Sequence, residues 1–525
     1  MPDVVVVGLG HNGLVAATLL ARAGLRVVGL ETAAVVGGAC RTEHPFPAAP
    51  GLGASTGAYL LGLMPPELAQ LLDLDLPLVR RDPHYFLPTL GERYLTMGTD
   101  RAAVRAQYEA FFSAADWAAD EAMQAELAAL RDDIAPAWLL DPLSVEETAE
   151  RWVRPSLRDA FVGLCRGSVA DYLDRFGFTS SLVTAMYAVT DGLSGVAAGP
   201  DSPGTGHNFL VHNMCRLPGA DGTWMIVRGG MGTVTGQLAD RASEAGAELR
   251  TASAVAEVLF ENGVVSGVAL ADGTTVHARV VVTGCDPFRL PGLLGAATPD
   301  ALRKRLDELR RPGSTLKVNL ALADLPRFGC LPADAPSPFG ATVHLLPDVP
   351  DVMGAVRTMW QDVEAGRLPD FPTIEWYLQT TVDPSLRDAQ GRHSGALFVQ
   401  SVPYAPAGSS WDAALPAYVD HLLSICDRFA PGTSDLVVDT FALPPPGIET
   451  YFGITGGHIH HVDNCVAFAD RVPYAVGVDG VYAASAGCHP AGSVIGAAGH
   501  NAAQRVLADL GYVGSLTSPS PSASG

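Results

Sequence analysis

The chain has 525 residues, enough for one large body or for two or three domains, and a substantial hydrophobic core is expected. Its 56 Asp and Glu residues exceed its 34 Lys and Arg residues, and the net charge of -22 argues against nucleic acid as a partner. The 8 cysteines form no C-x-x-C pair, which argues against a disulfide scaffold or a zinc site and favours a reducing cytoplasm.

The N-terminal residues show no basic segment before an apolar stretch, and no uncharged run reaches the roughly 18 residues that a membrane span needs. We therefore expect a cytoplasmic protein without a transmembrane segment, and peripheral contact with a membrane stays open. Only the end, residues 515–525, has the composition of a disordered tail. This tail is left outside the predicted fold.

The first motif is a glycine-rich turn between an expected strand and an expected helix. Residues 4–7 are four valines, a run typical of a buried parallel strand, and G-x-G-x-x-G follows at Gly8, Gly10 and Gly13. Gly8 permits the tight turn, Gly10 lets the backbone approach a pyrophosphate, and Gly13 lets the helix pack closely on the strand. The phosphates would lie at the helix N-terminus, which attracts anions.

An acidic residue completes this first unit. The helix is expected to end at about residue 23, and a second strand, over residues 26–30, ends at Glu31. A carboxylate at this place can accept hydrogen bonds from the ribose hydroxyls of NAD or FAD, and it argues against a ribose 2′-phosphate. The unit therefore predicts a dinucleotide site.

The next loop favours one of the two dinucleotides. Residues 35–43 read VVGGACRTE, with Gly37 and Gly38 followed by Arg41. This segment resembles the second glycine pair of the amine oxidase and phytoene desaturase class of flavoproteins, in which the loop closes over the FAD pyrophosphate. FAD is therefore the expected cofactor.

Further elements follow along the chain. Residues 99–133 predict a helical covering, and a glycine turn precedes a helix expected over 233–245. A hairpin with turns at ENG and ADG and a valine-rich strand at 280–283 come next. Residues 479–511 predict a short strand, a loop of small residues and a final helix.

Three motifs resemble one branch of the phytoene desaturase-like FAD oxidoreductases, which contains carotenoid ketolases and pyridine nucleotide-disulfide oxidoreductase domain proteins. They are GHNGLVAA near the N-terminus, VRGGMG in the middle and GCHPAGSVIGAAGHNAA near the C-terminus. The resemblance spans nearly the whole chain in the same order. It implies an α/β fold, with a discontinuous Rossmann-like FAD-binding domain and an inserted α+β substrate domain.

The resemblance also implies the domain boundaries. The FAD-binding domain would comprise residues 1–45, 224–290 and 475–514. The substrate domain would comprise residues 46–223 and 291–474.

Cofactor contacts carry over from the family residue by residue. Val255 would hold the adenine edge through its backbone, and Gly487, Gly492 and Val494 would lie where a helix N-terminus approaches the flavin ring. A positive dipole end there would stabilise the reduced, anionic flavin. The full set of expected cofactor-binding residues is Gly8, Gly10, His11, Asn12, Gly13, Glu31, Gly38, Arg41, Val255, Gly487, Gly492 and Val494.

Lys317 is a candidate catalytic residue. In the segment STLKVNLALADL, strand alternation points Lys317 and Asn319 to the same face. Related amine oxidases often place a strand lysine near flavin N5 through a water. The alternative is a lysine at a solvated sheet edge.

Two histidines are further catalytic candidates. His489, in GCHP, is the first choice for proton transfer or substrate orientation, and His461 matches a position that is commonly His in the resembling branch. His458 and His460 depart from that branch. They would project together from a strand, but no Asp or Cys completes a ligand set, so no metal is expected.

The resemblance implies an FAD-dependent oxidoreductase that acts on an apolar, polyene or isoprenoid-like substrate by desaturation, ketolation or related hydride chemistry. The alternatives are a flavoenzyme cyclase of polyene macrolactam or polyketide biosynthesis and a non-catalytic flavin-binding protein. Fold analogy cannot choose among these chemistries. The electron acceptor, which is oxygen, a quinone or NAD(P), and a homodimeric state stay open.

Overall fold

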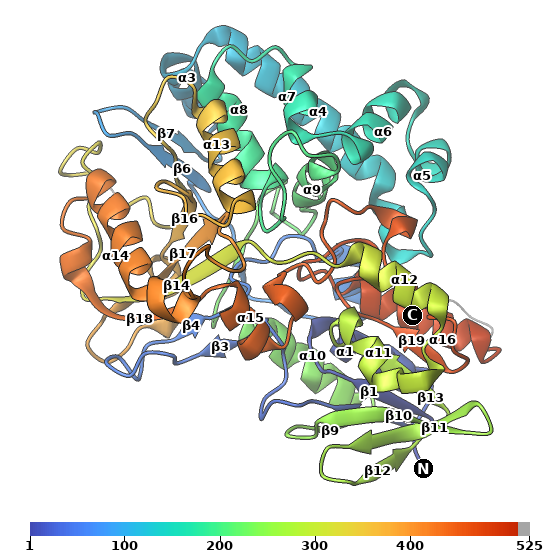
Figure 1. Ribbon diagram of the computed structural model, residues 1–525. Helices are drawn as coiled ribbons and strands as arrows, with labels where there is room; N and C mark the ends of the chain where they lie inside the picture. The colour runs from blue at the N-terminus through green and yellow to red at the C-terminus, as the bar shows by residue number, and fades with distance from the viewer. Residues whose placement is uncertain (336, 513–525) are drawn as a thin grey trace, which may run out of the picture.

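The computed structural model describes residues 1–335 and 337–512, so the predicted tail at 515–525 lies outside the described residues. Figure 1 shows three regions: a sheet domain that holds the N-terminus, a second domain around a large sheet, and a group of helices above both. This mixed α/β architecture with a parallel sheet confirms the predicted fold class.

The first domain is built on a five-stranded parallel sheet. Its strands lie in the order β19 (Val481–Ala483), β13 (Val280–Thr283), β1 (Val4–Val7), β2 (Val27–Leu30) and β9 (Glu248–Arg250). Every residue of β1 is buried, because helices cover both faces of a parallel sheet and apolar residues are needed on each. Helix α1 (His11–Arg22) packs against α10 (Gly232–Glu244) and α16 (Ala497–Asp509).

A small antiparallel sheet extends this domain. It contains β10 (Val255–Glu261), β11 (Val264–Leu270) and β12 (Thr275–His277). The β10–β11 turn has φ of 54° at Asn262 and 80° at Gly263, and the β11–β12 turn has φ of 86° at Gly273. Asn and Gly are the residues that adopt positive φ most readily, so the predicted hairpin turns are confirmed.

The second domain is built on a seven-stranded mixed sheet. Its order is β18 (Val437–Leu443), β14 (Thr315–Leu322), β17 (His393–Gln400), β16 (Thr373–Tyr377), β15 (Thr342–Leu345), β6 (Tyr85–Pro88) and β7 (Tyr94–Met97). Only the β15–β6 pair is parallel. One hydrophobic core joins this sheet to α14 (Trp411–Phe429) through residues such as Trp376, Leu397 and Leu422.

The third region is the helical covering. Its helices are α3 (Arg101–Phe111), α4 (Ala114–Ile134), α5 (Val145–Trp152), α6 (Arg158–Arg166), α7 (Val169–Asp174), α8 (Ser181–Tyr187) and α9 (Thr205–His212), with α13 (Val352–Glu364) against α8. The predicted covering at 99–133 is two helices, because Asp100 caps α3 and Ser113 caps α4. Ser113 therefore starts a new helix within the predicted segment.

Short elements connect these regions: β3 (Thr42–Glu43), β4 (Ala54–Ser55), α2 (Pro66–Leu71), β5 (Leu78–Val79), β8 (Ile226–Val227), α11 (Leu290–Leu294), α12 (Asp300–Leu309) and α15 (Pro445–Phe452). The parallel sheet takes its strands from three separate stretches of the chain. Its core also includes Leu68 of α2 and Leu306 of α12, so packing around the sheet extends beyond the expected boundaries at 45 and 290. Apolar faces of these short helices cover the sheet domain.

No helix within the described residues is long and apolar enough to cross a membrane.

Candidate active site

A large cavity, with a volume of about 1380 Å³, lies between the three regions. Its lining begins at Gly8 and Glu31 in the parallel-sheet domain, passes Lys317 on β14 and reaches Trp117 on α4. Typical ligand pockets measure about 300–1,000 Å³, so this cavity has room for a dinucleotide and a second molecule. We call the part lined by Gly8 and Glu31 the nucleotide end. We call the part beyond Lys317, which is lined by Arg81, Trp117 and Met186, the inner end.

The three glycines of the first motif have different surroundings. Gly8 adopts φ of +91°, which favours glycine, and a Cβ at Gly13 would overlap the carbonyl oxygen of Gly8. A Cβ at Gly10 would meet no atom within 4 Å. Gly8 and Gly10 line the cavity and Gly13 does not. Gly13 is therefore a packing residue, and Gly10 leaves open space at the start of α1.

The start of α1 has unsatisfied polar groups. Gly10 is the N-cap residue and has no side chain to cap the first N–H groups of the helix. The buried side-chain atoms His11 Nε2 and Asn12 Oδ1 have no hydrogen-bond partner among the described residues, and both residues line the cavity. Uncapped N–H groups at a helix N-terminus bind phosphate, so this end suits an anionic dinucleotide.

Glu31 lines the cavity at the end of β2 and is held by the backbone. Its Oε2 accepts a hydrogen bond from Leu9 N at 2.8 Å, and its Oε1 accepts one from Ala33 N at 2.9 Å. A carboxylate oxygen can accept a further hydrogen bond, so both oxygens can still receive ribose hydroxyls.

The remaining expected cofactor residues divide into two groups. Gly38, Val255 and Val494 line the cavity. Arg41, Gly487 and Gly492 do not line it. The guanidinium of Arg41 packs over the Phe452 ring at 5.3 Å from the ring centroid. A Cβ at Gly492 would overlap His460, so this glycine permits the close approach of two loops.

Lys317 is buried in the middle of the large sheet. Its strand β14 pairs with β17 on one side and β18 on the other, and the side chain is only 4% exposed, which excludes a solvated sheet edge. Its Nζ donates hydrogen bonds to the carbonyl oxygens of Ser55, at 2.7 Å, and Gly57. Burial holds the pKa of Lys317 well below its usual range.

A row of side chains crosses the sheet at Lys317. Lys317 lies opposite Phe398 on β17, and Phe398 lies opposite Glu375 on β16. Directly paired residues share one face of a sheet, and all three line the cavity. The following residues, Val318 and Trp376, belong to the hydrophobic core on the other face.

The inner end contains several ionisable groups that the sequence reasoning missed. Glu375 is buried and Asp191 lies near His212, with 3.8 Å between His212 Nδ1 and Asp191 Oδ1. Burial raises the pKa of Glu375, and it raises the pKa of Asp191 to about 7. Asp120 of α4 accepts a hydrogen bond from Tyr187, and burial also raises the pKa of Asp120. No sequence motif marks these residues, because each comes from a different segment.

The histidine segment 458–461 follows α15. His460 and His461 line the cavity, and His458 does not. The Nε2 of His460 lies 3.0 Å from the carbonyl oxygen of Ser194 and donates to it. Burial lowers the pKa of His460 to about 4 and also lowers the pKa of His461, so both rings are neutral near neutral pH.

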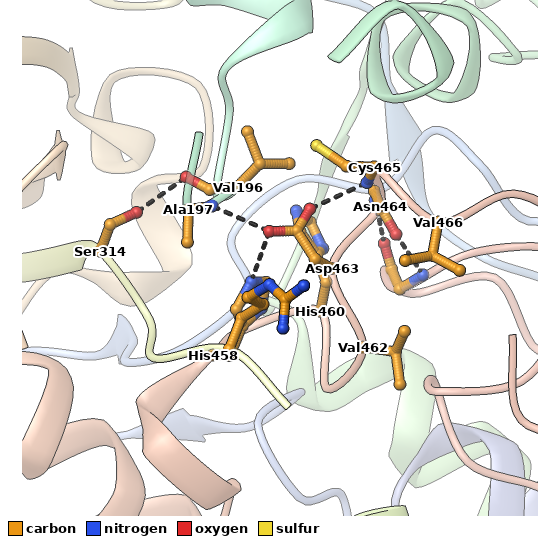
Figure 2. A network of polar contacts seen from close by, with 12 residues as sticks. Val196, Ala197, Ser314, His458, His460, Val462, Asp463, Asn464, Cys465 and Val466 are labelled. Atoms are coloured by element: carbon orange, nitrogen blue, oxygen red, sulfur yellow. Dashed lines mark hydrogen bonds and ion pairs between the residues drawn. The ribbon is translucent and has the colours of Figure 1, made fainter. Parts of the chain in front are cut away.

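His458 pairs with a buried carboxylate (Figure 2). Its Nε2 lies 3.0 Å from Asp463 Oδ2, which also accepts a hydrogen bond from Ala197 N at 3.0 Å. Although burial opposes ionisation, the neighbouring His458 and these hydrogen bonds hold the pKa of Asp463 well below its usual range. Within residues 1–335 and 337–512, no group of three His, Cys, Asp or Glu residues is arranged to hold a metal ion.

Arg471 joins the histidine segment to the C-terminal flavin loop. The guanidinium is buried and donates to the backbone carbonyls of Val462, Asp463, Val466, Ala486 and Cys488 at 2.9–3.1 Å. Asn464 adds a pair of hydrogen bonds with the backbone of Gly492, at 2.8 and 3.0 Å. These bonds set the position of His460 and His461 relative to Val494.

His489 lies outside the cavity lining. The residue is only 1% exposed, its Nε2 donates to the carbonyl oxygen of Ala137 at 3.0 Å, and its ring packs against Phe468. Burial lowers the pKa of His489 to about 3. This position favours a structural role, and it leaves His461 as the histidine candidate that reaches the cavity.

Comparisons with known proteins agree with this geometry. Residues 13–322 match the family model described as flavin containing amine oxidoreductase. Pyridine nucleotide-disulfide oxidoreductase domain-containing protein 2 of Mus musculus is 33% identical over 97% of this chain and 94% of its own. Hydroxyneurosporene desaturase of Cereibacter sphaeroides is 28% identical over 97% of this chain and 98% of its own.

A solved structure of an oxidoreductase from Methanosarcina mazei has the same fold, with a TM-score of 0.60 at 16% identity, and the match covers 96% of this chain and 100% of that one. The uncapped start of α1, the two orphaned polar atoms beside it and the held carboxylate of Glu31 fit an FAD molecule at the nucleotide end. The chain belongs to the flavin containing amine oxidoreductase family and is an FAD-dependent oxidoreductase related to the phytoene desaturase-like enzymes.

Proposed function

We propose that this oxidoreductase dehydrogenates a mainly apolar, polyene or isoprenoid-like substrate that lies in the inner end of the cavity. The observation that carries the proposal is the continuity of the cavity from the nucleotide end, past Lys317, into the helical covering. Met97, Val104, Trp117 and Met186 supply apolar lining there. A related protein, the hydroxyneurosporene desaturase, is named for a desaturation, which supports a polyene substrate for this chain.

When bound, FAD accepts a hydride from a substrate carbon. The chain itself must exclude water, orient the substrate and handle the proton that leaves with the hydride. Residues of α3, α4 and α8 line the inner end, so these helices would shield a substrate there from solvent. Shielding from water strengthens the electrostatic contacts made within such a site.

Lys317 is suited to order a water or to accept a proton. A neutral amine has two N–H bonds and one lone pair, and its two hydrogens are taken by the carbonyls of Ser55 and Gly57. The lone pair of Nζ is therefore left to accept a hydrogen bond from a water molecule. Burial lowers the pKa of Lys317 and so favours this neutral form.

His461 is the second proposed proton-handling residue. It lines the cavity, and its buried Nδ1 has no hydrogen-bond partner among the described residues. The neutral ring can accept a proton at this nitrogen or donate from it, depending on the tautomer. The predicted role of His489 in proton transfer has less support, because its ring lies outside the cavity lining.

An anaerobic experiment tests the proposed function. The purified FAD-loaded protein is mixed with an acyclic C40 polyene, with limonene or with putrescine, and the absorbance of the flavin is followed before air is admitted. We expect the polyene or the terpene to bleach the flavin and air or a quinone to restore it, with a dehydrogenated product. Bleaching by putrescine alone would contradict the proposal, and an absence of bleaching by all three would remove its support as a dehydrogenase of apolar substrates.

A further inference from the structure

Arg81 is a buried cation in the lining of the inner end. It lies in the connection between β5 and β6, and it is only 5% exposed. Its Nε donates to the carbonyl oxygen of Trp224 at 3.0 Å, and its Nη1 donates to Thr342 Oγ1 at 2.5 Å. Among the described residues, no hydrogen bond or ion pair joins its Nη2 to a protein group. A guanidinium has five N–H donors, so part of this donor set is left for a ligand.

The neighbouring carboxyl group of Glu375 compensates this charge only indirectly. Thr342 Oγ1 lies 3.4 Å from Glu375 Oε1, so the hydroxyl stands between the guanidinium and the carboxyl group. The Nε2 of His344 lies 3.9 Å from Glu375 Oε2. Burial raises the pKa of Glu375. Arg81 and Glu375 therefore act on each other at a distance and form no direct ion pair.

Three other ionisable groups that line the cavity, Asp120, Asp191 and Lys317, can lose their charge. Burial raises the pKa of the carboxyl groups of Asp120 and Asp191 and lowers the pKa of the Lys317 amine, and each of these changes favours the neutral form. An arginine cannot be neutralised in this way, because its guanidinium stays protonated in proteins. Arg81 is therefore the group in this lining whose burial leaves a lasting positive charge.

Two neighbours add hydrogen-bonding groups to this part of the lining, although burial lowers the pKa of His84 to about 4 and so favours its neutral ring. Arg80 lines the cavity, pairs with Asp221 through Nη1 and has a buried Nε without a partner among the described residues. His84 also lines the cavity, and its buried Nδ1 has no partner within that same part of the chain. Together with Arg81 they present several polar atoms from one short segment to one side of the cavity.

We propose that Arg81 binds a carboxylate of the substrate, so that the substrate is an apolar chain with one acidic end. This inference rests on the proposed function, because it adds a head group to the apolar substrate class. A carboxylate matches the planar donor edge of a guanidinium and would neutralise the buried charge with two parallel hydrogen bonds. The apolar part of the substrate would then extend along the side chains of Trp117, Met186 and Phe398.

A phosphate is a poorer match than a carboxylate. A phosphate monoester carries up to two negative charges near neutral pH, and Asp120, Asp191 and Glu375 share the same cavity. A dianion would raise the cost of ionising each of these carboxyl groups, whereas a single charge is balanced by Arg81 alone.

Binding measurements on matched ligands test this assignment. The FAD-loaded protein is titrated calorimetrically with farnesoic acid, farnesol and farnesyl phosphate, which share a chain and differ in the head group. We expect the acid to bind at least about tenfold more tightly than the alcohol, because a charge-assisted pair is worth more than a neutral hydrogen bond. In Arg81→Met the advantage of the acid should disappear, while the affinity for farnesol changes by less than about threefold.

Two further variants serve as controls. Arg81→Lys keeps the charge but not the planar fork, and it should keep part of the preference for the acid. Arg357→Met removes an exposed arginine that pairs with Asp201 and does not line the cavity, and it should leave all three affinities unchanged. Retention of FAD and the melting temperature show whether each variant is folded.

Each outcome bears on the carboxylate site, on the apolar substrate class or on both. Equal affinities for the acid and the alcohol, or an undiminished preference in a folded Arg81→Met, would overturn the carboxylate site and leave an apolar substrate in place. Tightest binding of the phosphate would overturn the choice of head group. Binding of none of the three ligands by the wild-type protein would overturn both the carboxylate site and the apolar substrate class.

Discussion

The two ends of the cavity are built in different ways. At the nucleotide end the lining includes several glycines and the uncapped start of α1, and much of it comes from one continuous stretch, residues 7–40. At the inner end the lining includes buried ionisable side chains, such as Arg81, Asp120 and Glu375, which come from distant segments. The nucleotide end is therefore encoded by local spacing, and the inner end by the packing of the whole molecule.

This difference has a chemical reason. Every FAD carries the same pyrophosphate and ribose groups, and a glycine turn with a following helix N-terminus recognises them through the backbone. A substrate pocket must distinguish one molecule from others, which requires side chains placed by tertiary contacts. Substitutions that alter the backbone should therefore affect mainly the nucleotide end, and substitutions of buried side chains should affect mainly the inner end.

The largest expected effect is on the free energy of unfolding, and it should differ between substitutions of Gly13 and Gly10. A Cβ in Gly13→Ala would overlap the carbonyl oxygen of Gly8, so α1 and β1 would have to move apart. We expect a loss of about 3 kcal/mol in the free energy of unfolding and a loss of FAD. Gly10→Ala has open space and a φ of -69°, so the apoprotein should keep its stability while its affinity for FAD falls.

Urea unfolding of the apoproteins and fluorescence titration with FAD measure these two effects. Equal destabilisation by both substitutions would mean that Gly10 is a packing residue as well. Unchanged FAD affinity in Gly10→Ala would contradict a close approach of the pyrophosphate at this position.

The next largest effect is on the rates of flavin reduction and reoxidation, and it should differ among three candidates for proton handling. His461→Ala should slow anaerobic reduction of the flavin by substrate at least about tenfold, because a positioned acid or base is lost. His489→Ala should change that rate by less than about threefold and instead lower stability by about 1–2 kcal/mol, because its hydrogen bond to Ala137 is buried. Lys317→Met should mainly change the rate of flavin reoxidation by oxygen.

Stopped-flow absorbance of the three variants distinguishes these roles, with FAD content and melting temperature as controls for folding. A strong loss of flavin reduction in a stable His489→Ala would return the catalytic role to His489. An unchanged rate of reoxidation in Lys317→Met would leave Lys317 with a structural role.

The smallest expected effect concerns Asp191. Its pKa is raised from 3.8 to about 7, so between these values the folded protein binds a proton that the unfolded chain has released. The free energy of unfolding should therefore fall as the pH rises through this range. Its side chain is 17% exposed, so we expect a loss of only about 1 kcal/mol between about pH 5 and pH 7.

Urea unfolding of the FAD-loaded protein at several pH values, compared with Asp191→Asn, isolates this contribution. The Asn side chain does not titrate, so the variant should lose less stability than the wild type as the pH rises. Identical pH profiles would show that Asp191 ionises at an ordinary pKa in the folded protein.

The secondary structure around the nucleotide end was predictable because its signals are local. The valine run gave β1, the expected helix after it is α1, and the turns at ENG and ADG separate β10, β11 and β12. The helix expected over 233–245 is α10, which the structure begins at Gly232. The helical covering differs, because Ser113 caps a second helix inside one continuous periodic segment.

For the candidate catalytic residues, residue type alone was a weaker guide. Lys317 and His461 do reach the cavity, but the same reasoning favoured His489, which points to Ala137. A loop sequence indicates which residues lie near a cofactor and leaves open the direction of each side chain. Hydrogen bonds with distant partners set that direction, as the bonds of Arg471 do for the loops on either side of it.

The sequence by itself determined the dinucleotide fold, because glycine spacing, strand and helix periodicity and an acid at the end of β2 act through contacts that are short in sequence. The resemblance of its motifs to known flavoproteins added FAD as the cofactor and the family. Only the tertiary structure decided which side chains share the inner end. Lys317, Phe398 and Glu375 form one row because three strands pair in register, and Arg81 joins them through Thr342. Register and burial depend on the packing of the complete chain, and they also set the charge of each buried group.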